Sequence, residues 1–375
     1  MKVLQAESQR ERYRFRAATV EVATEDAQAG RWLSEFVAPW LAPGSPDAAV
    51  ASVRTRFCAE SVARLEARRR HIEGIVVECF HLDNGLVSHP GWIEPDGATV
   101  AYDVTFRCYY RLCGDACEIV ALPGQRRARM GLLRAVREAA VAHASGEDWL
   151  DLHAAAFVVR GRTVLVVGAK LAGKTTLLAH ALASGEAGLL TNDRVIVVGG
   201  AQAHGIPTVI SLREPTLRTF PALADGLPAH AALLAREELP VRRPSEEPPS
   251  FPFRLSPAQF ADRLGARPVA SAPVGAIVFP EITRETRGLV LAPVASADGA
   301  RRLRESLYAR CSGPRQQTWF ERQAGVSPSL VAQTARSDEL AARVPCHRCL
   351  LGPDAYREPA HAWLASLPLA EAGPA

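Results

Sequence analysis

The sequence predicts an α/β protein of two domains, a smaller α+β domain over residues 1–147 and a larger α/β domain with a mixed sheet over residues 148–375. Three observations lead to this prediction. The first third of the chain alternates strand-like and helical runs, and a long helical segment ends it. Beyond that segment, a dense succession of short apolar strands surrounds one clear helix, a pattern typical of a mixed sheet around a nucleotide site.

The first domain is predicted from runs of β-forming residues and from helical periodicity. We expect strands over 13–22, 74–82 and 98–112, a helix over 24–37 opened by Thr24 with acidic residues in its first turn, and a helix over 126–146 that joins the two domains.

The second domain follows the same rules. We expect strands over 150–159, 163–167, 189–193, 195–200, 207–212, 275–282 and 288–293, and helices over 175–184 and 297–311. The segment Leu239–Phe253 is rich in proline and charge, so it predicts an exposed loop, either a simple connector or a substrate lid. We expect the last five residues to be frayed.

Composition narrows the classes of partner. Apolar residues make up 48% and charged residues 22% of the 375 residues, values normal for a globular protein. The net charge of +4 is spread along the chain and no recognition motif accompanies it, so we expect no nucleic-acid partner. No apolar run approaches the roughly 18 residues that a membrane span needs and no secretory signal is visible, so we expect a cytoplasmic protein with no membrane partner. Homo-oligomerisation is left open.

The eight cysteines are scattered along the chain, and we expect reduced thiols. Cys346 and Cys349 have the C-x-x-C spacing of a zinc or redox motif. Zinc needs a second pair of ligands, and Cys113 and Cys117 are far away with wider spacing. A plain strand over this segment is therefore the favoured interpretation.

A phosphate-binding motif stands in the middle of the chain. Residues 168–175 fit G-x-x-x-x-G-K-[ST] without a mismatch, between an apolar strand-like run and a helical run that stops at Gly185. The alternative is a buried strand that runs into a buried helix without a ligand, and the match with its flanking elements favours the phosphate loop. The residues predicted to hold a nucleotide are Gly168, Ala169, Lys170, Leu171, Ala172, Gly173, Lys174, Thr175 and Thr176.

The motif assigns a task to each polar residue. Backbone N–H groups of the loop and of the helix N-terminus face the phosphates, Lys174 neutralises the β- and γ-oxygens, and Thr175 lends its hydroxyl to Mg²⁺. The chain holds only three lysines, at 2, 170 and 174, against a large excess of arginine. Lysine is thus kept where a compact charge on a flexible stem is wanted. The role of Lys170 stays open between loop charge and surface residue.

Polar residues beside the motif complete the candidate site. Asn192 and Asp193 end the short apolar strand after the helix, which would place Asp193 near Mg²⁺ and the attacking group. The alternative is a simple turn, since Asn and Asp favour turns. His153 stands in a strand expected to run beside the loop strand, although a single histidine is more often structural than catalytic.

The run from Leu152 to Val198 resembles the core of HPr kinase/phosphorylase and of the HPr-kinase-like proteins, including those that phosphorylate lasso-peptide precursors. The resemblance implies a P-loop kinase domain with a mixed sheet of the HPr kinase/PEP carboxykinase type. It also implies that His153 handles the substrate proton beside the γ-phosphate, that Asp193 is metal ligand or general base, and that Arg213 meets phosphate.

Two departures from the family pattern stand out. Asn192 replaces one member of the usual acidic pair, and the glycine-rich signature of phosphorolysis is not visible. The resemblance then implies a one-way kinase that uses ATP and Mg²⁺ and transfers the γ-phosphate to a hydroxyl, most plausibly Ser or Thr of a peptide or small protein in natural-product biosynthesis, with the N-terminal domain recognising the acceptor. The alternatives are a nucleotide-regulated binding module without transfer and a kinase of a small metabolite.

Overall fold

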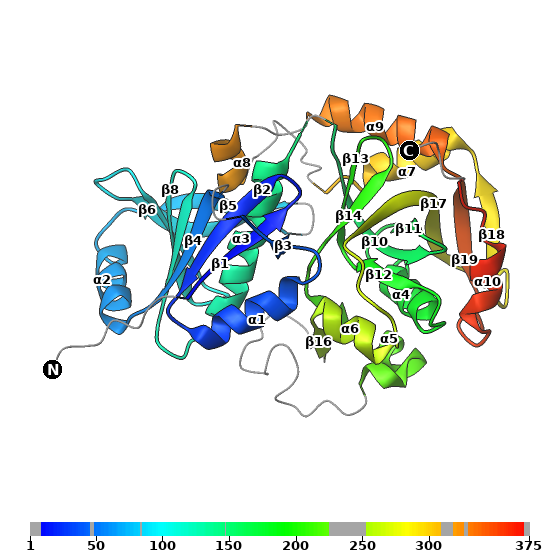
Figure 1. The fold of residues 1–375 in the computed structure, drawn as a ribbon, viewed down its shortest axis with the longest axis horizontal. Helices are drawn as coiled ribbons and strands as arrows, with labels where there is room; N and C mark the ends of the chain where they lie inside the picture. The colour runs from blue at the N-terminus through cyan, green and yellow to red at the C-terminus, as the bar shows by residue number, and fades with distance from the viewer. Residues whose placement is uncertain are drawn as a thin grey trace. The chain divides into compact units, whose positions relative to one another are not determined.

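The computed structural model describes residues 9–45, 49–82, 85–146, 148–224, 253–308, 318–325 and 329–370. It is a mixed α/β structure with two large sheets, and it divides into two compact units (Figure 1). Of the described residues, unit 1 comprises 9–45, 49–82, 85–146 and 318–325, and unit 2 comprises the remainder. The sequence analysis instead places residues 318–325 in the second domain.

Unit 1 is built on a nine-stranded mixed sheet with the strand order β3-β1-β2-β4-β9-β8-β7-β6-β5. Its central pairings of β2 with β4 and of β4 with β9 are parallel, and the others are antiparallel. The strands are β1 (Gln9–Phe15), β2 (Ala18–Thr24), β3 (Ala42–Pro43), β4 (Ala49–Phe57), β5 (Ile75–Leu82), β6 (Gly85–Ile93), β7 (Thr99–Asp103), β8 (Cys108–Cys113) and β9 (Ala116–Ala121).

Helices cover both faces of this sheet. The helices are α1 (Ala27–Val37), α2 (Ala59–Arg69), α3 (Ala128–Ala144) and α8 (Trp319–Ala324). Adjacent residues of β8 show the two sides, because successive side chains of a strand point to opposite faces. Tyr109 packs in the cluster that includes Val62 and Leu65 of α2, whereas the Tyr110 hydroxyl lies close to Gly131 of α3.

Several predictions for unit 1 are wrong in detail. The strand expected over 13–22 is the hairpin β1–β2, which turns at Arg16, and the strand expected over 98–112 is the pair β7 and β8. Asp26, and not Thr24, caps α1, and the first turn of α1 holds no acidic residue. The helix α3 precedes the passage of the chain into unit 2, as expected, and it packs along β1, β2, β4 and β9 of unit 1.

Unit 2 is built on an eight-stranded mixed sheet with the order β11-β10-β13-β14-β17-β19-β18, while β12 pairs with β10. The strand β11 also pairs with β17, so β10, β13, β14, β17 and β11 form a closed ring of pairings. The strands are β10 (Leu150–Val159), β11 (Arg162–Val167), β12 (Gly188–Thr191), β13 (Arg194–Val198), β14 (Gln202–Ile206), β17 (Ser271–Ile282), β18 (Leu289–Val294) and β19 (Cys346–Leu351). A separate two-stranded sheet joins β15 (Ile210–Leu212) to β16 (Phe253–Leu255).

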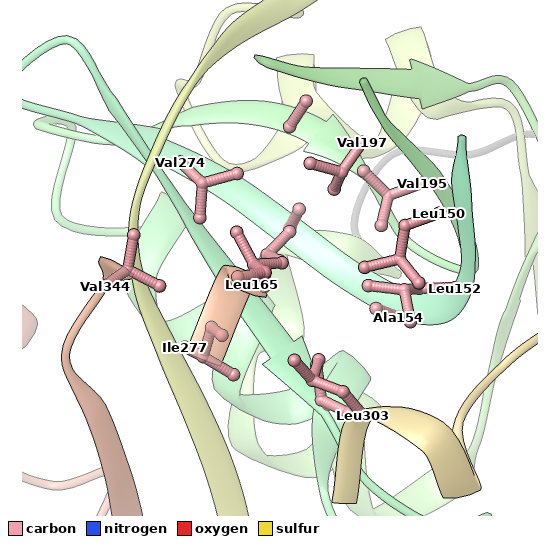
Figure 2. Packing of buried hydrophobic residues seen from close by; sticks show 14 of the residues in the cluster. Leu150, Leu152, Ala154, Leu165, Val195, Val197, Val274, Ile277, Leu303 and Val344 are labelled. Atoms are coloured by element: carbon pink, nitrogen blue, oxygen red, sulfur yellow. The ribbon is translucent and has the colours of Figure 1, made fainter. Parts of the chain in front are cut away.

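The helices of unit 2 lie around this sheet and seal its core. They are α4 (Lys174–Leu182), α5 (Glu214–Thr219), the 3₁₀ turn η2 (Pro221–Leu223), α6 (Pro257–Arg263), α7 (Ser296–Glu305), α9 (Leu330–Arg343) and α10 (Ala360–Ser366). Figure 2 shows Leu152 and Val195 of neighbouring strands pointing into one apolar cluster with Leu303 of α7, all of them almost fully buried. Burial on this scale is the main force that fixes the strand ends next to the phosphate-loop motif.

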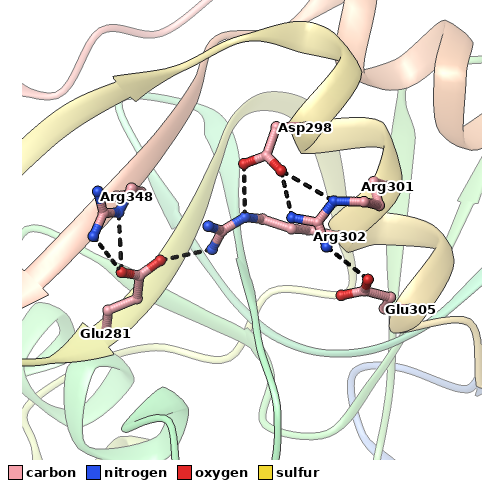
Figure 3. Close-up of polar contacts among 6 residues, drawn as sticks. All are labelled: Glu281, Asp298, Arg301, Arg302, Glu305 and Arg348. Atoms are coloured by element: carbon pink, nitrogen blue, oxygen red, sulfur yellow. Dashed lines mark hydrogen bonds and ion pairs between the residues drawn. The ribbon is translucent and has the colours of Figure 1, made fainter.

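An ion-pair network fastens α7 to the sheet (Figure 3). Glu281 of β17 accepts from Arg302 of α7 over 2.7 Å and from Arg348 of β19 over 2.7 Å. Arg302 also lies over the ring of Phe279, with its guanidinium carbon 5.2 Å from the ring centroid. The pKa of Glu281 is lowered by these arginines, chiefly by the hydrogen bond from Arg348.

The predicted elements of unit 2 are present with shifted bounds, and α7 is shorter than the helix expected over 297–311. Several elements of the structure are not predicted, namely the strands β14 and β16 and the helices α5, α6, α9 and α10. The strand expected at the C-x-x-C spacing is present as β19, where burial raises the pKa of Cys346 to about 11 and that of Cys349 to about 12. Residues three apart on a strand face opposite sides, so these thiols do not converge on one metal.

Residues 225–252, which hold all but the last residue of the Leu239–Phe253 loop, and the last five residues lie outside the described ranges. Among the helices that the structure describes, none is long and apolar enough to cross a membrane.

Candidate functional site

The predicted phosphate loop lies between β11 and α4, at the carboxyl end of a buried strand. Gly173 stands immediately before α4 with φ 98°, in the left-handed region that favours glycine. A Cβ atom at this position would lie 3.1 Å from Leu351 and 3.7 Å from the hydroxyl of Tyr356. The second glycine of the motif is therefore favoured both by its backbone conformation and by the close approach of Leu351, the last residue of β19.

Lys174 is folded back over the loop that precedes it. Its Nζ donates to the carbonyl of Gly168 over 2.6 Å and to that of Ala169 over 3.2 Å, and the residue is only 9% exposed. A buried ammonium placed at the opening of α4 adds a full positive charge to the partial positive charge of the helix N-terminus. The arrangement suits an anion held by the loop.

The remaining loop residues differ in how far they are enclosed. Ala169, Lys170 and Leu171 are exposed, and Leu171 takes a left-handed backbone with φ 73°. Ala172 and Thr175 are half-buried. The exposed crest and the enclosed ends give a loop whose backbone can wrap a ligand from one side.

Thr176 has a different neighbour from the one the motif suggests. Its hydroxyl lies 2.9 Å from that of Thr216, so it ties the first turn of α4 to α5. Arg213 immediately precedes α5 and is half-buried. Because Thr216 follows Arg213 by less than one helical turn, this contact sets the position of Arg213 relative to α4.

The structure brings His153 and Asp193 together beside the loop. Ala154 of β10 pairs with Val167, the last residue of β11 before the loop, so His153 stands one residue from the point at which β11 gives way to the loop. The backbone N–H of Ala154 donates to the carbonyl of Asp193 over 3.0 Å. The Nδ1 atom of His153 lies 3.4 Å from Oδ1 of Asp193, and the two side chains are 19% and 33% exposed.

Asn192, the residue before Asp193, carries a buried side-chain oxygen. Its Oδ1 atom is buried and has no hydrogen-bond partner among the described residues. An unpaired buried acceptor costs about 1 to 3 kcal/mol unless a ligand, ion or water satisfies it. An amide oxygen next to a carboxylate is a donor set that Mg²⁺ accepts, so the pair Asn192 and Asp193 fits this ion.

The side chains beside the loop could hold Mg²⁺ only together with other ligands. In the described part of the chain, no group of three or more His, Cys, Asp or Glu side chains is placed to hold a metal ion. Mg²⁺ is usually held by one or two carboxylates together with substrate phosphates and waters. Thr175, Asn192 and Asp193 are thus a sufficient protein contribution only where a phosphate ligand is also present.

Sequence reasoning missed three residues that lie near the His153–Asp193 pair. Asp151 and Arg194 form an ion pair inside unit 2, and Tyr308 covers it. The only signal in the sequence is a charged residue at one end of each of two otherwise apolar strands, LDLHAAAFVV and RVIVV. Charges in such strands usually mark a strand end, so the pairing is visible only after the fold brings β10 and β13 together.

An aromatic cluster supports α4 from behind. His180 stacks on Trp363 with ring centroids 6.4 Å apart and packs edge-on against Tyr356 at 5.3 Å. Burial lowers the pKa of His180 to about 4. A neutral imidazole therefore packs here like an aromatic side chain and holds the helix that starts at Lys174.

Comparison with known proteins adds no family to this description. No protein-family model matches the chain, and no curated protein matches it either.

Proposed function

We propose that this protein is an ATP- and Mg²⁺-dependent kinase of the HPr-kinase-like type that transfers the γ-phosphate to a hydroxyl. One observation carries the proposal. A glycine- and lysine-bearing loop with Lys174 folded over its carbonyls lies next to a His153–Asp193 pair on the adjoining strands. Anion-binding and proton-accepting groups are thereby placed side by side, as phosphoryl transfer requires.

The residues have distinct tasks in holding the substrate. Backbone N–H groups of the loop and the Lys174 ammonium bind the phosphates, and Lys174 exchanges its present carbonyl partners for phosphate oxygens. Thr175, Asn192 and Asp193 would hold Mg²⁺, which when bound neutralises charge that develops on the transferred phosphoryl group. Arg213 is proposed to add a cation on the side of α5.

The chemical step is a direct displacement. The acceptor oxygen forms a bond to the γ-phosphorus while the bond from this phosphorus to the β–γ bridging oxygen breaks, and its electron pair leaves with ADP. Asp193 accepts the hydroxyl proton. His153, whose Nδ1 lies 3.4 Å from Oδ1 of Asp193, holds this carboxylate in position and stabilises its negative charge before the proton arrives. Lys174 stabilises the leaving phosphate by its fixed charge.

The two departures from the family pattern bear on whether the protein also removes phosphate from its product. With Asn192 in place of a second acid, only Asp193 can take up a proton at this strand end. Phosphorolysis, the attack of inorganic phosphate on the phosphorylated acceptor, would also need a place for that second phosphate, and the glycine-rich signature of this activity is not visible in the sequence. We infer a one-way kinase whose acceptor is a Ser or Thr hydroxyl of a peptide or small protein, with unit 1 recognising that acceptor.

The test is incubation with γ-labelled ATP, Mg²⁺ and a panel of Ser- and Thr-containing peptides, with small alcohols in parallel. The proposal expects label on a peptide and no label with Asp193→Asn, although that variant still binds ATP. Label on a small alcohol alone would move the acceptor to metabolites. ATP binding with no transfer to any acceptor or to water would favour a nucleotide-regulated binding module instead.

A further inference from the structure

The buried ion pair between Asp151 and Arg194 lies directly under the proposed catalytic pair. Nε of Arg194 donates to Oδ1 of Asp151 over 3.1 Å, and Nη2 donates to Oδ2 over 2.7 Å, a two-pronged contact. The arginine side chain is 1% exposed and the aspartate side chain 9%. Such a pair is costly to bury, and an apolar pair of similar volume often stabilises a fold equally well.

Tyr308 completes the enclosure from another part of the chain. The guanidinium carbon of Arg194 lies 4.3 Å from the centroid of the Tyr308 ring, and the His153 ring centroid lies 6.3 Å from the same ring. The backbone carries Tyr308 there, because its N–H donates to the carbonyl of Asp151 over 2.8 Å and the N–H of His153 donates to the carbonyl of Ser306 over 2.8 Å. The residues after α7 thus bond to the backbone of β10 through an isolated bridge at Leu307.

The ion-pair network in Figure 3 gives this segment its fixed position, since it holds α7 against β17 and β19. The bridge between Leu152 and Leu307 continues that attachment up to β10. The backbone position of Tyr308 is therefore fixed both by α7, which precedes it, and by its hydrogen bond to β10.

The arrangement matters for the site because of where Arg194 stands. It follows Asp193 in the chain and lies directly opposite His153 in the register of β10 and β13. Side chains of directly opposed residues in an antiparallel pair are about 5 Å apart at Cβ. Without another partner, a buried guanidinium at this place would compete with His153 for the carboxylate of Asp193.

We propose that Asp151 and Tyr308 act as positioning residues, which hold the guanidinium of Arg194 away from Asp193 and so keep that carboxylate for His153 and the acceptor hydroxyl. This proposal rests on the kinase function proposed above. It assigns no contact with substrate to Asp151, Arg194 or Tyr308.

The test compares Asp151→Asn with the wild-type protein in three measurements. The affinity for ATP without Mg²⁺, measured by calorimetry, should stay within about twofold, because the loop is unchanged. ADP release from saturating MgATP, with water in place of the acceptor, should fall at least about tenfold, since a general base that loses its orienting partner loses much of its effect. The ¹⁵N resonance of His153 Nδ1 in selectively labelled protein should move, which a purely structural loss elsewhere would not cause.

A matched control separates positioning from folding. Asp103→Asn removes a carboxylate that is also buried and also paired with an arginine, Arg134, but in unit 1. Its cost in stability should be similar, whereas the His153 resonance and ADP release should stay at wild-type values. Asp151→Glu should restore part of the turnover that Asp151→Asn loses.

A second variant guards against misfolding. Tyr308→Leu keeps an apolar cover and leaves the ion pair, so it should lower turnover by about threefold and move the His153 resonance by a smaller amount. A folded Asp151→Asn with unchanged turnover and an unchanged His153 resonance would overturn the proposal. If Asp151→Asn does not fold, the same unchanged values in Tyr308→Leu would overturn it. A wild-type protein that fails to bind ATP would instead refute the kinase function, while the resonance comparison, which needs no nucleotide, still decides the positioning claim.

Discussion

Two buried carboxylates, one in each unit, show how similar chemistry serves different ends. In unit 1, Asp103 is 1% exposed and is satisfied from three directions, by the N–H of Phe106 at 2.9 Å, the hydroxyl of Tyr110 at 3.1 Å and Arg134 at 3.2 Å. In unit 2, Asp151 directs both of its oxygens to Arg194.

The neighbouring histidines carry the same contrast. His89 lies 3.8 Å from Asp103 and is only 5% exposed, and burial lowers its pKa. His153, in contrast, is paired with a partly exposed carboxylate beside the loop that we propose to bind phosphate. A buried polar cluster whose members satisfy one another, such as that around Asp103, has a structural role. A buried pair that borders a partly exposed pair, as Asp151 and Arg194 border His153 and Asp193, can instead support a ligand site.

The largest expected effect tests the structural side of this comparison. Asp103→Asn leaves Arg134 without its buried counter-ion, so we expect a loss of about 3 to 5 kcal/mol in the free energy of unfolding. Urea denaturation measures this loss, and calorimetry should show MgATP affinity unchanged. A drop in ATP affinity as large as that of a loop variant would break the comparison, because Asp103 would then act on the site.

The next effect concerns His180, a buried polar residue behind α4. Its folded-state pKa of about 4 lies below the ordinary value of 6.5, so protons favour the unfolded chain. The stability that depends on the neutral imidazole is complete above pH 6.5 and declines as the pH falls toward 4, by about 3 kcal/mol in total. In denaturation at several pH values, His180→Leu should lose part of the acid dependence of the wild type. An unchanged slope between pH 6.5 and 4 would contradict this role.

A smaller effect is expected from the loop glycine. Gly173→Ala forces a side chain into a left-handed conformation, which costs about 1 to 2 kcal/mol, and pushes on Leu351. We expect MgATP affinity to fall at least about tenfold, which is 1.4 kcal/mol. Gly185→Ala is the matched control, because Gly185 follows the same helix with φ 75° and open space around it. Equal loss of affinity in both variants would show that strain in α4, rather than the loop, is responsible.

The smallest effect tests the link between α4 and α5. Thr216→Val removes the hydroxyl that lies 2.9 Å from that of Thr176. We expect a loss of about 1 kcal/mol in stability and a change in MgATP affinity of no more than about threefold. A larger loss of affinity would mean that the position of α5, and with it Arg213, matters for MgATP binding more than this account assumes.

The sequence predicts the parts of this site that a local motif can encode. The strand, glycine turn and helix around Lys174 follow from residue order, and the proximity of His153 follows from an adjacent strand. Asp151, Arg194 and Tyr308 could not be found in this way, because Tyr308 stands 157 residues beyond Asp151 (308 − 151) and reaches it only through the placement of α7.

Three of the errors in the fold share a weak local signal. The hairpin of β1 and β2 and the turn between β7 and β8 use Arg16 and Arg107 at positive φ, where a turn is normally signalled by glycine or asparagine. The strand β14 has the sequence QAHGI, which lacks β-forming character, and it is formed by its neighbours β13 and β17. In each case tertiary pairing overrode a weak local signal.

Calorimetric titration of MgATP into the wild-type protein and into Lys174→Met tests the account most directly. The account predicts a saturable heat for the wild type and at least about a hundredfold weaker binding for the variant, because Lys174 supplies the buried charge at the opening of α4. Absence of binding to the wild type, or equal binding by a folded Lys174→Met, would contradict it.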